Sequence, residues 1–100
     1  MIRSPKETVT RSHVEAVSAG RAGDHLQVDP TKIWTVMLTP AGGRARVQYT
    51  IALDLDDPLA VWTDWKPGAI KDGTQDTITG VTGIRAVTGV GVNANLEVRG

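Results

Sequence analysis

The stretch IWTVMLTPAGGRARVQYTIAL, residues 33–53, determines the fold that the sequence predicts. In its second half, apolar residues occupy every other position: Val47, Tyr49, Ile51 and Leu53. This is the period of a β-strand with one buried face. In the first half, Trp34, Val36 and Leu38 share one face in the same way. Pro40 cannot donate to a strand ladder, and Gly42 and Gly43 tolerate positive φ, so the sequence predicts a β-hairpin with a loop of about four or five residues.

The same alternation continues towards the C-terminus. Residues 92–98 place four apolar side chains on one face: Val92, Ala94, Leu96 and Val98. Residues 81–88 are predicted as a strand with Ile84, Ala86 and Thr88 on one face, turned back by Gly89-Val90-Gly91. Shorter strands are predicted at 26–28 and 60–65. About seven short strands separated by turns predict an all-β fold, a small antiparallel β-sandwich or barrel.

The N-terminal segment has the weakest pattern. Residues 1–8 are predicted to form a flexible arm on a single β domain that covers residues 1–100. Between residues 8 and 18, the valines fit neither a strict strand nor a long helix. Ser12 and Glu15 have the spacing of a capping box, which would start a helix near Thr10. The β-branched residues, and the short distance to Gly20, favour an irregular strand.

Composition restricts the classes of partner. The formal net charge is zero, which argues against binding nucleic acid by neutralising phosphates. The chain has no cysteine, and no apolar run approaches the length of a membrane span. The first seven residues lack the apolar core of a signal peptide, so we expect synthesis and retention in a cytoplasm.

Candidate catalytic and metal-binding residues are few. Asp54, Asp56 and Asp57 could gather oxygen ligands, but the loop lacks the glycine and distal glutamate of an EF-hand. Acidic loop tips of this kind are usually solvated. His25 beside Asp24 has the residue types of a general base, but the pattern offers no matching nucleophile. The sequence therefore predicts no metal, no cofactor and no enzymatic activity.

The tryptophans have two interpretations. Trp34, Trp62 and Trp65, with Tyr49, could form an aromatic platform for sugar or peptide. In a small sheet without phenylalanine they more often fill the core, and we expect this of Trp34 and Trp62. Trp65 precedes a Lys-Pro-Gly turn and is predicted to lie at the surface, available to a partner.

Four arginines occupy predicted outward-facing strand positions: Arg44, Arg46, Arg85 and Arg99. One interpretation is that they keep the protein soluble and protect sheet edges from unwanted pairing. The other is that they form salt bridges to a neighbouring subunit.

Several segments together resemble the small β-sandwich virion proteins of tailed bacteriophages, most closely head decoration (cement) proteins. They are VQYT at 47–50, WTDWKPG at 62–68, VTGIRAVT at 81–88 and ANLEV at 94–98. The resemblance covers residues 33–100. It implies a non-enzymatic structural protein on the capsid surface, made in the host bacterial cytoplasm. It also implies binding to the major capsid protein or to other copies of itself as a homo-oligomer, with no nucleic acid or membrane partner.

The predicted partner-binding residues come from the basic N-terminal segment 1–12 and from the end of the predicted 60–65 strand: Arg3, Lys6, Arg11, Trp65 and Lys66. We expect this segment to become ordered against a capsid or a sister subunit by adding to an exposed sheet edge. The alternatives are a neck or tail accessory protein, or a carbohydrate- or receptor-binding β module that uses Trp65 and the acidic loop.

Overall fold

The computed structural model describes residues 6–9, 12–17, 23, 25–55, 57–65, 68–89 and 91–100, with backbone alone at residues 6–8, 13 and 15. Within these residues it contains nine strands and no helix. The strands are β1 (Lys6–Thr8), β2 (Ser12–Val17), β3 (His25–Gln27), β4 (Ile33–Ala41), β5 (Ala45–Thr50), β6 (Thr63–Asp64), β7 (Thr74–Thr79), β8 (Gly83–Thr88) and β9 (Asn93–Arg99).

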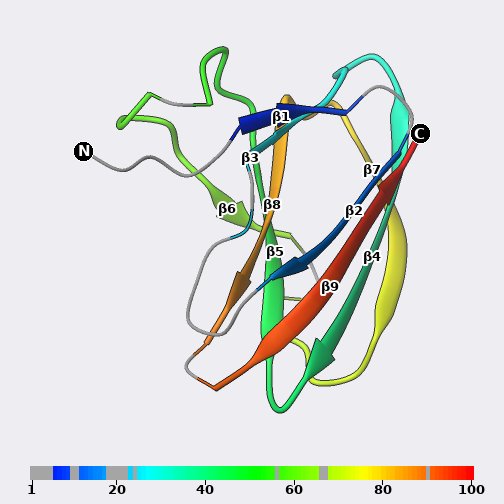
Figure 1. The fold of residues 1–100 in the computed structure, drawn as a ribbon. Coiled ribbons are helices and arrows are strands. Elements are labelled where there is room, and N and C mark those ends of the chain that lie inside the picture. Colours follow the sequence, from blue (N-terminus) through cyan, green and yellow to red (C-terminus); the bar gives the residue numbers. More distant parts are fainter. Residues whose placement is uncertain are drawn as a thin grey trace.

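The strands form two sheets that stack as the layers of a β-sandwich (Figure 1). The five-stranded sheet has the order β1-β3-β8-β5-β6, and the four-stranded sheet has the order β2-β9-β4-β7. Every described strand pair is antiparallel except β1 with β3. The predicted all-β sandwich is therefore confirmed.

The core lies between the sheets, where the alternating apolar residues meet. Trp34, Val36 and Leu38 of β4 are fully buried, as the alternation predicted. In β8, in β9 and at the residue before β9, the predicted inner faces are also buried: Ile84, Ala86, Thr88, Val92, Ala94, Leu96 and Val98. Removing this apolar surface from water is the main favourable contribution to folding.

The predicted hairpin over residues 33–53 is wrong. β4 pairs with β7 and β9, whereas β5 pairs with β6 and β8. The connection between β4 and β5 therefore crosses from one sheet to the other. β4 keeps its predicted apolar face and β5 keeps the part of its face at Val47, but the two faces oppose each other across the core instead of lying side by side.

The predicted turn after β8 crosses in the same way, because β8 and β9 also belong to different sheets. The two crossings meet at one end of the sandwich. A Cβ atom on Gly43 would lie 2.6 Å from Cγ2 of Val92, and Gly42, at φ +88°, lies close to the carbonyl oxygen of Gly91. Glycine at these positions permits both the backbone conformation and the close approach.

The strand predicted up to Leu53 ends earlier, at Thr50. Tyr49 is half-buried, and Ile51 and Leu53 are 71% and 97% exposed, so their predicted inward positions are wrong. Beyond Thr50, the carbonyl oxygen of Ala52 accepts from Oγ1 of Thr82 at 2.6 Å. The strand predicted at 60–65 is reduced to Thr63–Asp64.

The N-terminal predictions are corrected in part. Residues 12–17 form β2, so the helix alternative is wrong. Lys6–Thr8 forms β1 rather than a free arm, and Val9 after it is buried, with its N–H donating to the carbonyl oxygen of Gln27 at 2.8 Å. β1 joins the sheet through backbone hydrogen bonds to β3. Backbone hydrogen bonds require no alternation of apolar side chains, so the sequence pattern did not predict this strand. Residues 1–5 lie outside the described part of the chain.

Candidate functional site

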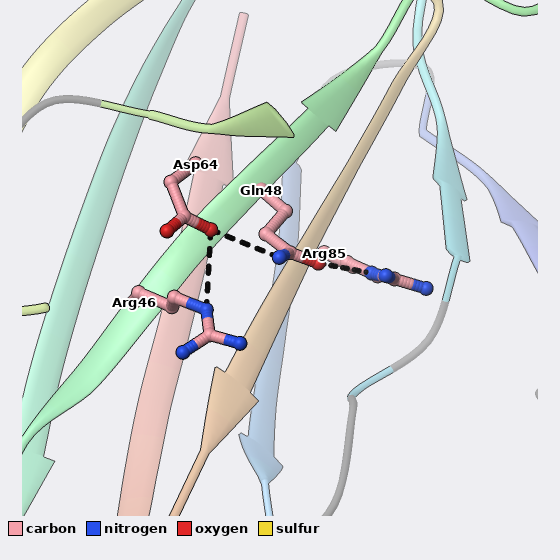
Figure 2. Close-up of polar contacts among 4 residues, drawn as sticks. All are labelled: Arg46, Gln48, Asp64 and Arg85. Carbon is pink, nitrogen blue, oxygen red and sulfur yellow. Dashed lines mark hydrogen bonds and ion pairs between the residues drawn. The ribbon is translucent and has the colours of Figure 1, made fainter. Parts of the chain in front are cut away.

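The outer face of the five-stranded sheet carries a polar network that follows from strand alternation. Val47 and Ile84 point into the core, so their neighbours Arg46, Gln48 and Arg85 point outward. β6 pairs Asp64 directly with Gln48, which places the carboxylate on the same face. Figure 2 shows Asp64, Gln48 and Arg85 in a row across β6, β5 and β8, with Arg46 further along β5 and joined to Asp64.

Asp64 and Gln48 connect the row. Nε2 of Gln48 donates to Oδ1 of Asp64 at 2.9 Å, and its Oε1 accepts from Nε of Arg85 at 2.8 Å. Arg46 Nε lies 3.1 Å from the same Asp64 oxygen, although without the alignment of a hydrogen bond. The Arg46 and Asp64 side chains are 41% and 52% exposed, so this ion pair contributes little to stability.

Arg85 extends from Gln48 towards β3, where its partners are a histidine ring and an indole ring. Its Nη1 lies 3.3 Å from Nε2 of His25, and its guanidinium carbon stacks 4.3 Å from the ring centre of Trp62. Burial lowers the pKa of Arg85 from its ordinary value, and the charge of Arg46 lowers it further. Stacking on an indole suits a partly desolvated guanidinium.

Trp62 lies at the end of a long connection whose described residues, 51–55 and 57–62, we call the β5–β6 loop. In Figure 1 this segment, in green, stands out from the sheets at the upper left. Leu55 anchors it and is 3% exposed. A Cβ atom on Gly83 would lie 2.6 Å from Cδ2 of Leu55, so this side chain covers the outer face of β8 where Gly83 leaves space.

Hydrogen bonds within the β5–β6 loop hold its shape. The N–H of Asp57 donates to the carbonyl oxygen of Asp54 at 3.2 Å, and the N–H of Ala60 donates to that of Asp57 at 2.9 Å. The Asp57 carboxylate also accepts from the N–H of Leu59 at 2.9 Å. The loop is therefore built from consecutive turns, between the Leu55 anchor and the Trp62 stack.

This ordered loop presents apolar side chains to solvent. Four of the most exposed large hydrophobic residues of the described chain lie on it: Ile51 (71%), Leu53 (97%), Leu59 (84%) and Val61 (75%). Single exposed apolar residues are common on protein surfaces, but a set gathered on one segment is typical of an interaction site.

An open groove continues from this loop, between the β6 edge of one sheet and the β7 edge of the other. It is lined by Tyr49, Ile51, Asp64, Trp65, Ile78, Thr79, Gly80 and Val81. Ile51 belongs to both the loop and the groove. Ile51 therefore links the loop to the groove between the sheets.

The predicted partner-binding residues do not form one site. Trp65 is buried in the core at 6% exposure, so its predicted surface position is wrong. Trp62, predicted to be core, is instead half-buried against Arg85 on the outer face. Lys6 belongs to β1. The remaining residues of that prediction, Arg3, Arg11 and Lys66, lie outside the described residues.

The other candidate groups are dispersed. His13 and His25 belong to different sheets. Arg46 pairs with Asp64 of its own chain, and Arg99 pairs with Glu97 on the four-stranded sheet. Asp54 and Asp57 are exposed on the loop. Among the described residues, no group of three or more His, Asp or Glu side chains is arranged to hold a metal ion.

Sequence reasoning missed two features of this region. The sequence predicts a strand as far as Leu53 followed by a solvated acidic tip, and the leucines that flank the aspartates and Pro58 were the available signal for an exposed apolar surface. β7 was not predicted as a strand, because TQDTIT contains one apolar residue and hence no alternation. Its β-branched residues were the available signal.

Comparison with family models, curated proteins and solved structures finds no match to this chain. No helix long and apolar enough to span a membrane occurs in the part of the chain that the structure describes.

Proposed function

We propose that this chain is a non-enzymatic structural protein of a tailed-bacteriophage virion, a decoration protein that binds the outside of the head. Its partner is the major capsid protein, and its binding surface is the β5–β6 loop. The phage class is supported by the sequence resemblance. The binding surface is supported by the exposed apolar side chains on an ordered loop, which is the observation that carries the proposal.

The physical argument begins with desolvation. Covering Ile51, Leu53, Leu59 and Val61 removes apolar surface from water and favours association. The turns and the Leu55 anchor hold the loop before binding, so less conformational entropy is lost when a partner covers it.

Charge indicates the kind of partner. Residues 51–64 contain four aspartates and no lysine or arginine. A complementary surface would therefore be an apolar recess with basic residues at its rim. Many copies on one shell would act together, so weak individual contacts would still stabilise the head.

The test uses expanded heads of the phage whose genome encodes the chain. We expect the purified protein to co-sediment with these heads, and the double variant Leu53→Asp, Leu59→Asp to lose at least about tenfold in affinity, equivalent to about 1.4 kcal/mol. Both side chains are exposed, so the variant should fold normally. Val14→Asp is the matched control, because Val14 is 64% exposed on the other sheet.

Retained binding by the double variant would show that the loop is not the binding surface. Binding of the wild-type protein to isolated tails or necks, but not to heads, would favour the accessory-protein alternative. The carbohydrate-binding alternative relied on Trp65 at the surface, and Trp65 is buried.

A further inference from the structure

The half-buried guanidinium of Arg85, on the outer face of the five-stranded sheet, is held in place by three side chains. Its Nε donates to Oε1 of Gln48 at 2.8 Å, and its Nη1 lies 3.3 Å from Nε2 of His25. Its carbon stacks 4.3 Å from the ring centre of Trp62. None of these three partners is a carboxylate, so within the described chain these contacts orient the guanidinium without neutralising its charge.

The carboxylate on the same face, Asp64, is already shared by two other side chains. Its Oδ1 accepts from Nε2 of Gln48 at 2.9 Å and lies 3.1 Å from Nε of Arg46. In Figure 2 the Arg85 guanidinium lies at the opposite end of the row from Asp64. Burial lowers the pKa of Arg85 and the charge of Arg46 lowers it further, and a bound anion would oppose both effects.

The remaining donors of Arg85 define what it could bind. A guanidinium has five N–H donors, and the contacts with Gln48 and His25 use one on Nε and one on Nη1. The other N–H groups, on Nη1 and Nη2, form a planar fork that matches the two oxygens of a carboxylate. The Trp62 ring, which His25 also contacts at 4.9 Å between ring centres, supports this fork from its face.

We propose that Arg85 binds a carboxylate of an acidic segment on a protein partner, through the fork of its terminal N–H groups. Because its contacts orient the guanidinium before binding, little side-chain entropy is lost when the carboxylate arrives. Arginines are frequent among the residues that dominate binding energy. A carboxylate is favoured over the phosphates of a nucleic acid, since a net charge of zero gives no general attraction for a polyanion.

This site adds a second sign of charge to the surface that the partner must present. Residues 51–64 contain four aspartates and no lysine or arginine, so basic groups of a partner suit the β5–β6 loop. Trp62 of that loop stacks on Arg85, which an acidic group suits instead. Opposite charges at two neighbouring points determine the orientation in which a partner binds.

The test is an NMR titration of the isotope-labelled full chain, without heads, at constant ionic strength. The probe is the capped peptide acetyl-Glu-Glu-Glu-Glu-amide, and inorganic phosphate is titrated in a second arm. We expect the Arg85 Nε–H and Trp62 Nε1–H signals to shift and to saturate with the peptide below about 20 mM. Phosphate should bind more weakly than the peptide.

Two matched variants separate the fork from general charge. Arg85→Lys keeps the positive charge but loses the fork, so it should weaken the binding seen at Trp62 at least about fivefold. Arg99→Lys is the control, because Arg99 lies on the four-stranded sheet, and it should bind as the wild type does. Thermal unfolding verifies that both variants fold.

Shifts that do not saturate, or tighter binding of phosphate than of the peptide, would overturn this inference. So would equal binding by Arg85→Lys and the wild type, or equal weakening by Arg99→Lys. None of these results bears on attachment to heads, which is measured separately with the variants at Leu53 and Leu59.

Discussion

At the scale of single residues, the turn before β4 shows how polar groups position the core. The Nε1 of Trp34 is a donor that burial would leave unsatisfied, and it donates to the carbonyl oxygen of Asp29 at 2.9 Å. Pro30 follows in the turn, and the Asp29 carboxylate accepts from both the N–H and the hydroxyl of Thr31, at 2.8 and 2.6 Å. The largest fully buried side chain is thus oriented by a turn on the surface.

These hydrogen bonds predict the titration of Asp29. Hydrogen bonding by Thr31 lowers the pKa of Asp29 below its ordinary value. The carboxylate therefore contributes to stability above the unfolded-state pKa of about 3.9, and this contribution is lost as the pH falls through the lowered folded-state pKa. In Thr31→Val, we expect the Asp29 pKa to rise towards its ordinary value, measured by NMR titration of the carboxyl carbon. An unchanged pKa would show that the hydroxyl does not stabilise the charged form.

At the scale of elements, the β5–β6 loop depends on one missing side chain. Gly83 lies in β8 between Thr50 of β5 and Gln27 of β3, and its lack of a Cβ gives Leu55 a place on the sheet. The Trp62–Arg85 stack holds the other end of the loop. Two contacts with β8 therefore determine where the exposed leucines are presented.

We predict that Gly83→Ala displaces Leu55, because the new Cβ would lie 2.6 Å from Leu55 Cδ2 and 3.0 Å from Thr50 Cγ2. Overpacking of this kind costs about 1–3 kcal/mol in the free energy of unfolding, measured by urea denaturation. Attachment to heads should weaken as well. Gly89→Ala is the control, since nothing lies within 4 Å of a Cβ there. Equal stability of the two variants would contradict the anchoring role of Leu55.

At the scale of the whole molecule, the sheets join segments from opposite ends of the sequence. β2 pairs with β9, from Ser12 opposite Arg99 to Val17 opposite Ala94. β1 extends the other sheet through β3. The first described strands therefore complete both layers, so the N-terminal region is part of the domain.

Truncation tests this role. Deleting residues 1–8 removes β1 and leaves Val9 without its preceding strand, so we expect a lower unfolding temperature. Each 1 kcal/mol lost should lower Tm by about 4–8 °C in a domain of this size. Deleting residues 1–5 leaves β1 in place, and is the matched control. If both truncations unfold at the wild-type temperature, β1 adds nothing to the stability of the fold.

The sequence by itself determined which segments are extended and which of their faces are buried. Alternation at Trp34, Val36 and Leu38, and from Val92 to Val98, is a local property, because consecutive side chains of a strand point to opposite sides. The outward positions of Arg46 and Arg85 followed from the same rule. The candidate site was not foreseen as a unit, because its residues come from different strands and a loop.

Tertiary structure decided which strand lies beside which. The alternation in residues 33–53 predicts one buried face for each strand. It does not specify whether the two strands pair in one sheet, as in a hairpin, or belong to opposite sheets, as they do here. Trp62 and Trp65 are three positions apart, and side chains with this spacing in a strand point to opposite faces. The pairing of Gln48 with Asp64 places Asp64 on the outer face, so the next residue, Trp65, points inward. Ile51 and Leu53 are exposed, and Ala52 between them accepts a hydrogen bond from Thr82, 30 residues away in the sequence. Contacts between residues that are distant in the sequence leave no local periodicity. They are determined only when the two sheets pack against each other.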